Sequence, residues 1–176
     1  MATSGPAIAR RRGFTLIELI VVVTLIGVLA ALLLDRVRLY QESAEKAAME
    51  QTIGTFRSAL NLQVASLLLR GRETEINSLA AQNPVTWLTE PPKGYAGEFR
   101  ARDVKVDRGS WYYDATAREL VYVPILDTHL NVKAEGRKLL RFKVVVEYEQ
   151  PAADNQKRAG LTAIRVASST PFDWSP

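Results

Sequence analysis

The longest apolar run in the chain extends from Phe14 to Leu34 and contains a single charged residue, Glu18. As an α-helix this run would be about 31 Å long, because each residue adds about 1.5 Å. That length matches the hydrocarbon core of a bilayer, which is about 30 Å thick. Residues 14–34 are therefore predicted to form a transmembrane helix.

The helical pattern continues beyond the membrane segment. Residues 35–70 lack proline, and their apolar side chains recur three to four positions apart, at Ala48/Met49, Ile53, Phe56, Leu60, Val64 and Leu67/Leu68. This period is typical of an amphipathic helix, and no sustained heptad favours a coiled coil instead. The Arg70-Gly71 step is a typical helix end. The sequence predicts one helix from Phe14 to Arg70, whose second half packs on the chain's own sheet.

Residues 71–98 interrupt this pattern with proline and glycine. A short helix is predicted over Glu73–Ala81, with Thr74 as its cap. The segment that follows, from Asn83 to Glu98, contains Pro84, Pro91 and Pro92. Proline and glycine exclude a central strand, so a structured loop pinned by Trp87 and Tyr95 is expected. A proline-rich ligand for a partner protein is the alternative interpretation.

From residue 99 onward the apolar positions alternate, which is the pattern of β-strands. The predicted strands are Phe99–Val106, Ser110–Tyr113, Glu119–Val123, Leu139–Glu149 and Leu161–Ala167. Short turns between consecutive strands indicate antiparallel pairing. The predicted fold class is thus α+β, with a long N-terminal helix packed on a four- or five-stranded antiparallel sheet formed by residues 99–176.

Three arginines, Arg10, Arg11 and Arg12, immediately precede the apolar run. The excess of positive charge on the cytoplasmic side of membrane proteins predicts that residues 1–13 form a cytoplasmic leader. Glu18 would cost on the order of 3 kcal/mol inside a bilayer unless it had a partner. Its own helix offers no cation within one turn. A free amine on Phe14, created by cleavage after Gly13, could reach Glu18 of a staggered neighbouring chain, so the anchor would also serve assembly.

The stretch Arg12-Gly13-Phe14-Thr15-Leu16-Ile17-Glu18-Leu19 resembles the class III signal of type IV pilins and of the pseudopilins of type II secretion. The resemblance implies cleavage between Gly13 and Phe14 by a prepilin peptidase, N-methylation of Phe14, and pairing of Glu18 with the Phe14 amine of an adjacent subunit. It also implies a single-pass protein of the bacterial inner membrane with a periplasmic domain. Its implied partners are other pilin or pseudopilin subunits, an inner-membrane assembly platform and the lipid bilayer. The implied assembly residues are Glu18, Thr15, Leu16 and Ile17.

Composition refines this expectation. Without Arg10, Arg11 and Arg12, the 23 basic residues fall to 20 against 19 acidic ones, so the processed chain is nearly neutral. The chain has no cysteine, which excludes the C-terminal disulfide of many major pilins. Many family members also carry a proline where this chain has Asp35. Both departures favour a pseudopilin or a minor pilin over a major subunit.

Other interpretations remain open at this stage. A secretory signal cut near Val28-Leu29-Ala30 would also place basic residues before an apolar run, but its apolar region would be unusually long and would contain Glu18. An uncut, monomeric membrane anchor is a second alternative. A third is an adhesive or DNA-binding minor pilin.

Few residues suggest further chemistry. His129 is the only histidine and lies in no motif for catalysis, and no phosphate-binding glycine loop is present, so enzyme activity is not expected. No cofactor is expected either, and the candidate ligands for calcium are Asp154, Asn155 and Asp173. Two basic clusters would form one face if their strands were neighbours, but acidic residues interleave, so a nucleic-acid partner is not expected. The clusters are Arg100, Arg102, Lys105 and Arg108, and Arg137, Lys138, Arg141 and Lys143.

Overall fold

The structure is a computed structural model that describes residues 13–100, 104–133, 136–148 and 161–176. The chain divides into two compact units, Met1–Leu39 and Tyr40–Pro176. Each unit is described by itself below.

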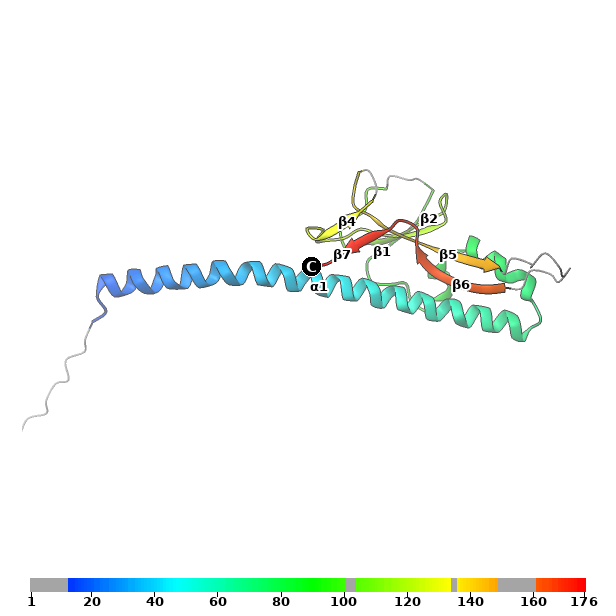
Figure 1. The fold of residues 1–176 in the computed structure, drawn as a ribbon, viewed down its shortest axis with the longest axis horizontal. Helices are drawn as coiled ribbons and strands as arrows, with labels where there is room; N and C mark the ends of the chain where they lie inside the picture. Colours follow the sequence, from blue (N-terminus) through cyan, green and yellow to red (C-terminus); the bar gives the residue numbers. More distant parts are fainter. Residues whose placement is uncertain (1–12, 101–103, 134–135, 149–160) are drawn as a thin grey trace, which may run out of the picture. The chain divides into compact units, whose positions relative to one another are not determined.

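One α-helix, α1 (Leu16–Leu69), confirms the prediction of a single long helix (Figure 1). In its second half, the buried side chains Met49, Ile53, Phe56 and Leu60 are three to four positions apart. They therefore lie on one face of the helix. Between these positions, the remaining residues from Ala44 to Thr55 are exposed or half-buried. This half is thus the predicted amphipathic helix, and its apolar face forms one wall of the core.

The end of α1 follows the expected glycine stop. Gly71 has a φ of 67°, a left-handed conformation that glycine adopts without steric cost. Its N–H donates to the carbonyl of Leu68, and the N–H of Arg72 donates to the carbonyl of Leu67. This pair of hydrogen bonds is the Schellman motif, which satisfies carbonyls that the helix leaves without partners.

Two short 3₁₀ helices follow, η1 (Glu73–Ala81) and η2 (Pro84–Trp87). The prediction that Thr74 caps the first of them is wrong, because the cap position is Arg72 and no side chain caps it. Asn83 caps η2 instead, since its side-chain oxygen accepts the N–H of Val85 at 3.1 Å. Tyr95 and Trp87 are tied to this segment by hydrogen bonds with Asn83 and Gln82.

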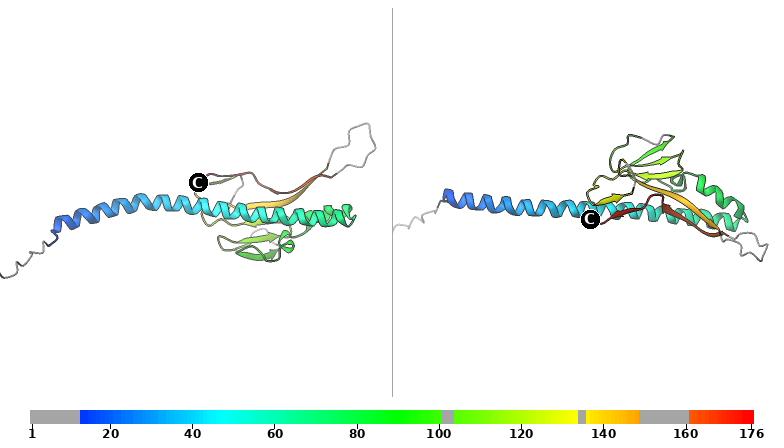
Figure 2. Two further views of the ribbon diagram at one scale, coloured as in Figure 1. Left: turned by 90° about the horizontal axis from the view of Figure 1, so that it is seen from below. Right: turned by 45° about the horizontal axis from the view of Figure 1, so that its top comes forward.

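The main sheet has five strands in the order β1-β2-β3-β5-β6. They are β1 (Tyr95–Phe99), β2 (Trp111–Asp114), β3 (Glu119–Tyr122), β5 (Leu140–Tyr148) and β6 (Leu161–Ser168). Every neighbouring pair is antiparallel except β1 and β2, which are parallel. The fold is therefore α+β with a mixed, mostly antiparallel sheet, and both views in Figure 2 show this sheet alongside the second half of α1.

The first predicted strand, Phe99–Val106, is placed too late. Phe99 is the last residue of β1, residues 101–103 lie outside the described part, and residues 104–107 form no strand. The strand begins early because Gly94, at φ 77°, lets the chain approach Gly109. A side chain at Gly94 would come within 2.8 Å of the Gly109 carbonyl oxygen. The carbonyl of Gly94 also accepts the N–H of Trp111, which starts the parallel pairing.

A separate two-stranded antiparallel sheet joins β4 (Leu130–Val132) to β7 (Phe172–Trp174). The sequence did not predict it, because three-residue strands carry too few positions to show alternation. Trp174 is almost fully buried and belongs to the main core. This small sheet therefore closes one end of the core against α1.

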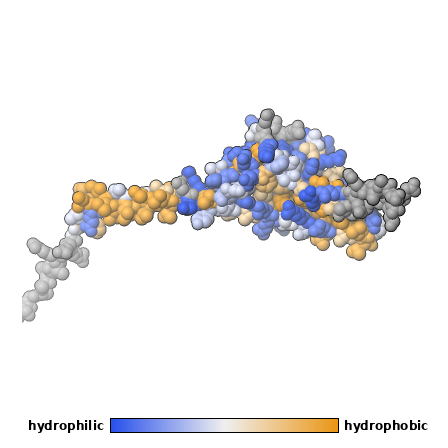
Figure 3. Space-filling view, in the orientation of Figure 1, coloured by the Kyte–Doolittle hydropathy of each residue, from blue (hydrophilic) through white to orange (hydrophobic). Residues whose placement is uncertain are grey.

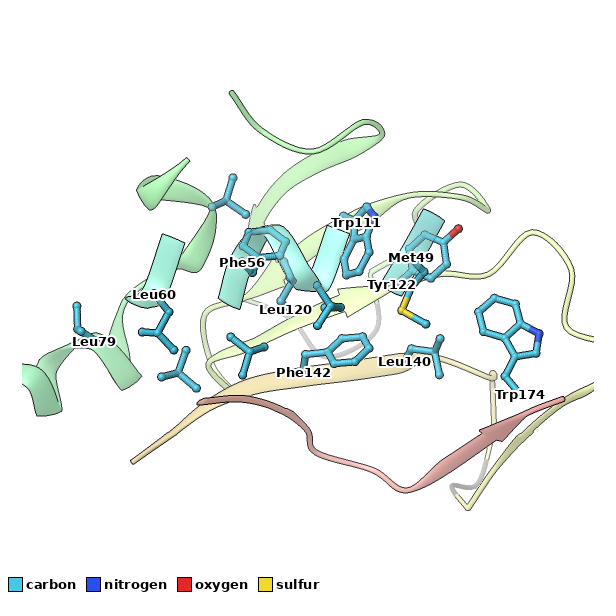
Figure 4. Close-up of a cluster of buried hydrophobic side chains, with 14 of the residues drawn as sticks. Met49, Phe56, Leu60, Leu79, Trp111, Leu120, Tyr122, Leu140, Phe142 and Trp174 are labelled. Carbon is cyan, nitrogen blue, oxygen red and sulfur yellow. The ribbon is translucent and has the colours of Figure 1, made fainter. Parts of the chain in front are cut away.

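Aromatic rings fill the core between α1 and the main sheet (Figure 4). The ring of Trp111 lies 4.7 Å from that of Tyr122, 6.2 Å from that of Phe142 and 6.3 Å from that of Phe56, between ring centroids. A smaller cluster of Tyr112, Val121 and Val123 is buried separately. The sheet is thus covered by apolar side chains on both faces at its centre.

Candidate functional site

The chain enters α1 through a three-residue segment, Gly13-Phe14-Thr15, that has no helical structure. The hydroxyl of Thr15 accepts the N–H of Glu18 at 3.3 Å, and its carbonyl accepts the N–H of Leu19 at 3.2 Å. Thr15 is therefore the N-cap residue of α1. The spacing Thr15-x-x-Glu18 is also that of the capping box, a motif in which the two residues stabilise a helix start.

Gly13 is exposed and has no neighbour that would demand a glycine. A side chain built at this position would meet no atom within 4 Å, and its backbone does not have the left-handed conformation that favours glycine. Phe14 beside it is 74% exposed. The fold of this unit therefore places no constraint on the side chain at position 13.

Glu18 lies in the first turn of α1 and is exposed. Leu16 and Ile17, which precede it in the same turn, are also exposed. A carboxylate there interacts favourably with the positive end of the helix dipole. Among the residues that the structure describes, no cation lies within ion-pair distance of Glu18. Its charge therefore has no partner in the described part of the chain.

Behind Glu18, the surface of α1 is apolar as far as Leu34, and none of the strongly apolar window is buried by the rest of the chain. Figure 3 shows this hydrophobic surface along the first half of the helix. By its length and composition α1 could cross a membrane. A bare apolar helix of this kind is stable only in lipid or against other helices.

In the second unit, Glu42 of α1 is a buried carboxylate, 2% exposed, with three hydrogen-bond donors. Its Oε1 accepts the N–H of His129 and the indole N–H of Trp174, each at 2.9 Å. Its Oε2 lies 2.8 Å from Nδ1 of His129. Burial alone would raise the pKa of Glu42, but the hydrogen bonds from His129 and Trp174 outweigh it and hold the pKa below the ordinary value.

One turn further along α1, Glu45 and Lys46 bind the same end of the domain. Glu45 accepts the Tyr122 hydroxyl at 2.9 Å and the backbone N–H groups of Ile125 and Leu126 at 2.6 and 2.9 Å. Lys46 donates to the Trp174 carbonyl at 2.7 Å. Burial, with the adjacent Glu45 carboxylate, raises the pKa of Tyr122. We call Glu42, Glu45 and Lys46 the helix clamp, because they fasten α1 to the loop after β3 and to β7.

The helix clamp predicts a pH dependence. Because the folded-state pKa of Glu42 is lowered, its stabilising effect is fully present above its unfolded-state pKa and is lost as the pH falls through the lower folded value. The free energy of unfolding, measured in urea, should therefore fall below about pH 4.5 with a steeper slope in the wild type than in Glu42→Gln. Equal slopes in the two proteins would show that folding does not lower the pKa of Glu42.

Sequence reasoning missed the helix clamp. The sequence assigns no partner to His129, which is exposed, lies just before β4 and is bonded to Glu42. Glu42 and Glu45 stand among alanines, a pattern that is typical of a solvated helix face. Nothing in their spacing shows that residues far along the chain, such as Trp174, cover them.

Of the other sequence candidates, the structure describes only some. Asp173 is exposed, and its Oδ1 accepts the Ser175 hydroxyl at 2.7 Å. Asp154 and Asn155 lie outside the described residues, as do Arg10, Arg11, Arg12 and Arg102. In the part of the chain that the structure describes, no three acidic or histidine residues gather as a metal site would require.

The described members of the first basic cluster, Arg100, Lys105 and Arg108, lie between β1 and β2 and not on a strand. The two clusters approach each other, because Arg137 donates to the Val106 carbonyl at 3.2 Å. Asp127 lies between them, with its carboxylate 3.7 Å from Arg108 and its carbonyl accepting from Lys138. Arg141 of the second cluster pairs with Glu119 at 3.2 Å.

Comparison with known families finds one match. Residues 8–34 match the prokaryotic N-terminal methylation motif. No curated protein and no solved structure matches the chain. The matched residues include Gly13, Phe14, Glu18 and the whole apolar surface of α1 up to Leu34.

Proposed function

We propose that this type IV pilin-like protein is a pseudopilin or a minor pilin, cut after Gly13 and polymerised through α1. Hydrolysis would add water across the Gly13–Phe14 bond and leave a carboxylate on Gly13 and an amine on Phe14. A methyl donor would then methylate that amine. The protein's work would be mechanical, as a subunit of a secretion pseudopilus or of a pilus.

Two observations together carry this proposal. The Gly13–Phe14 bond lies outside α1, and the apolar first half of α1 carries the carboxylate of Glu18, which has no partner among the described residues. Gly13 and Phe14 precede α1 and are exposed, so a protease could reach the bond between them. Glu18 has no cation in its own described chain, although its position in the apolar segment requires one. A Phe14 amine on a neighbouring subunit supplies a charge of the right sign.

Assembly through α1 is supported by the lack of cover on its first half. Helices in lipid associate by close packing and by polar contacts, because lipid tails are as apolar as leucine side chains. Gly27 and Ala30–Ala31 offer small side chains for close approach within this segment. The Glu18–amine pair would set the stagger between subunits, while packing along residues 19–34 would supply most of the contact area.

The proposed location is the bacterial inner membrane. In that arrangement the leader faces the cytoplasm, where the prepilin peptidase would cut it, and residues 40–176 face the periplasm. The three arginines of the leader support this orientation. The absence of cysteine and the presence of Asp35 support a pseudopilin or minor pilin rather than a major subunit.

The test is the mass of the N-terminal peptide of the protein taken from membranes that contain a prepilin peptidase. A peptide that begins at methylated Phe14 is expected for the wild type. In Gly13→Val the uncut precursor should remain, although the chain itself has room for the side chain. A wild-type peptide that begins at Met1, or beyond Val28, would refute the proposal in favour of a plain anchor or a secretory signal.

A further inference from the structure

The bond that the proposed function requires to be cut lies two residues before the first residue of α1. Gly13, Phe14 and Thr15 are not helical, whereas every residue from Leu16 to Leu69 is. A protease cuts backbone that is exposed and free of hydrogen bonds, and a bond inside a helix must first be released by local opening. Processing therefore depends on where the helix begins.

The Thr15 side chain marks that beginning. Its hydroxyl oxygen accepts the N–H of Glu18, one of the donors that a helix leaves without a backbone partner. In this geometry Thr15 has left the helix while its carbonyl already accepts the first helical bond, from Leu19. No neighbouring atom prevents Gly13 from becoming helical, because nothing lies within 4 Å of a side chain built there.

We propose that Thr15 is a positioning residue for the proteolytic step, and that its hydroxyl keeps the Gly13–Phe14 bond outside α1 in an exposed segment. This inference rests on the proposed cleavage after Gly13. In that hydrolysis the carbon–nitrogen bond breaks, the oxygen of water joins the Gly13 carbonyl carbon, and its protons go to the Phe14 nitrogen and to solvent. Thr15 takes no part in the bond changes; it determines whether the bond is reachable.

Loss of the cap has a defined consequence. When residue 15 is alanine, a strong helix former without an acceptor, the helix can extend over Phe14 and Gly13. The cleavable form then becomes a minor, locally opened state. Where opening is fast, the cleavage rate is proportional to the population of that state.

The experiment follows cleavage of the full-length protein in membranes by a prepilin peptidase, with the peptide that begins at Phe14 quantified over time by mass spectrometry. Thr15→Ala is expected to be cut about threefold to tenfold more slowly than the wild type, the range that a lost N-cap implies. Thr15→Val, which keeps the shape and loses the hydroxyl, should also be slow. Thr15→Ser and Thr15→Asn, which restore an acceptor, should be cut within about twofold of the wild-type rate.

A second readout reports the helix start itself. Hydrogen exchange at the amides of Leu16 and Ile17 should slow in Thr15→Ala and stay fast in Thr15→Asn, because these N–H groups gain carbonyl partners four residues before them only when the helix grows upstream. Cleavage of Thr15→Ala at the wild-type rate would overturn the inference.

Slow cleavage of Thr15→Asn, with hydrogen exchange at the helix start as fast as in the wild type, would also overturn the inference. The peptidase would then be recognising the shape of threonine rather than the helix start. Failure of the wild type to be cut after Gly13 would refute the proposed function as well, and the two failures are therefore distinguishable.

Discussion

Replacing Glu18 with alanine should leave cleavage after Gly13 intact and reduce incorporation of the subunit into filaments more than tenfold. Removing one partner of a desolvated charge pair costs about 2–5 kcal/mol, and about 1.4 kcal/mol is a factor of ten in an equilibrium constant. Glu18 is the one ionisable residue between Phe14 and Leu34, so no other side chain of the segment could replace its charge. The measurement is the fraction of processed protein in sheared or pelleted filaments.

Two further variants separate the charge from the shape of the side chain. Glu18→Gln keeps the size and loses the charge, and it should fail to assemble as Glu18→Ala does. Thr24→Val is the matched control, because Thr24 is polar, lies in the same apolar segment and donates only to the Ile20 carbonyl of its own helix. Normal assembly of Glu18→Gln would show that the carboxylate is not paired with an amine.

Replacing Glu42 with alanine is expected to lower the free energy of unfolding by about 3 kcal/mol. The variant strands the Trp174 indole N–H and the His129 backbone N–H, which both donate to this carboxylate, and it opens a gap at a site that is 2% exposed. Urea unfolding of the full-length protein in detergent, followed by tryptophan fluorescence, measures the change. Trp174 itself reports on the loss of its partner.

A control for Glu42 lies on the same helix. Glu50 is exposed, so Glu50→Ala should change the free energy of unfolding by less than about 0.5 kcal/mol. If Glu42→Ala proved no more destabilising than Glu50→Ala, the three hydrogen bonds of Glu42 would contribute nothing net to the fold.

The long helix and most strands could be predicted because their signals are local. The spacing from Met49 to Leu60 and the alternation from Leu140 to Val144 both identify buried faces that the structure confirms. The position of β1 could not be predicted in this way. It depends on Gly94 approaching Gly109, fifteen residues away, and on a parallel pairing that a local pattern does not encode.

The candidate processing site could be located from sequence since its residues are contiguous, from Gly13 to Glu18. The helix clamp could not, because Glu42 acquires its meaning from His129 and Trp174. Asp114 is a similar case. It lies at the predicted turn and accepts the N–H groups of Thr116 and Ala117, as expected for a turn, yet it is also fully buried near Arg141.

The bond between Glu42 and Trp174 joins residues that are 132 positions apart. During synthesis, the turn of α1 that carries Glu42 therefore leaves the ribosome long before the residue that completes its hydrogen bonding exists. A chain that stops before Trp174, or is trimmed there by an exopeptidase, keeps α1 and the main sheet, but its Glu42 carboxylate lacks the indole N–H that binds it. Such a chain would open most readily around Glu42, where a protease could remove it.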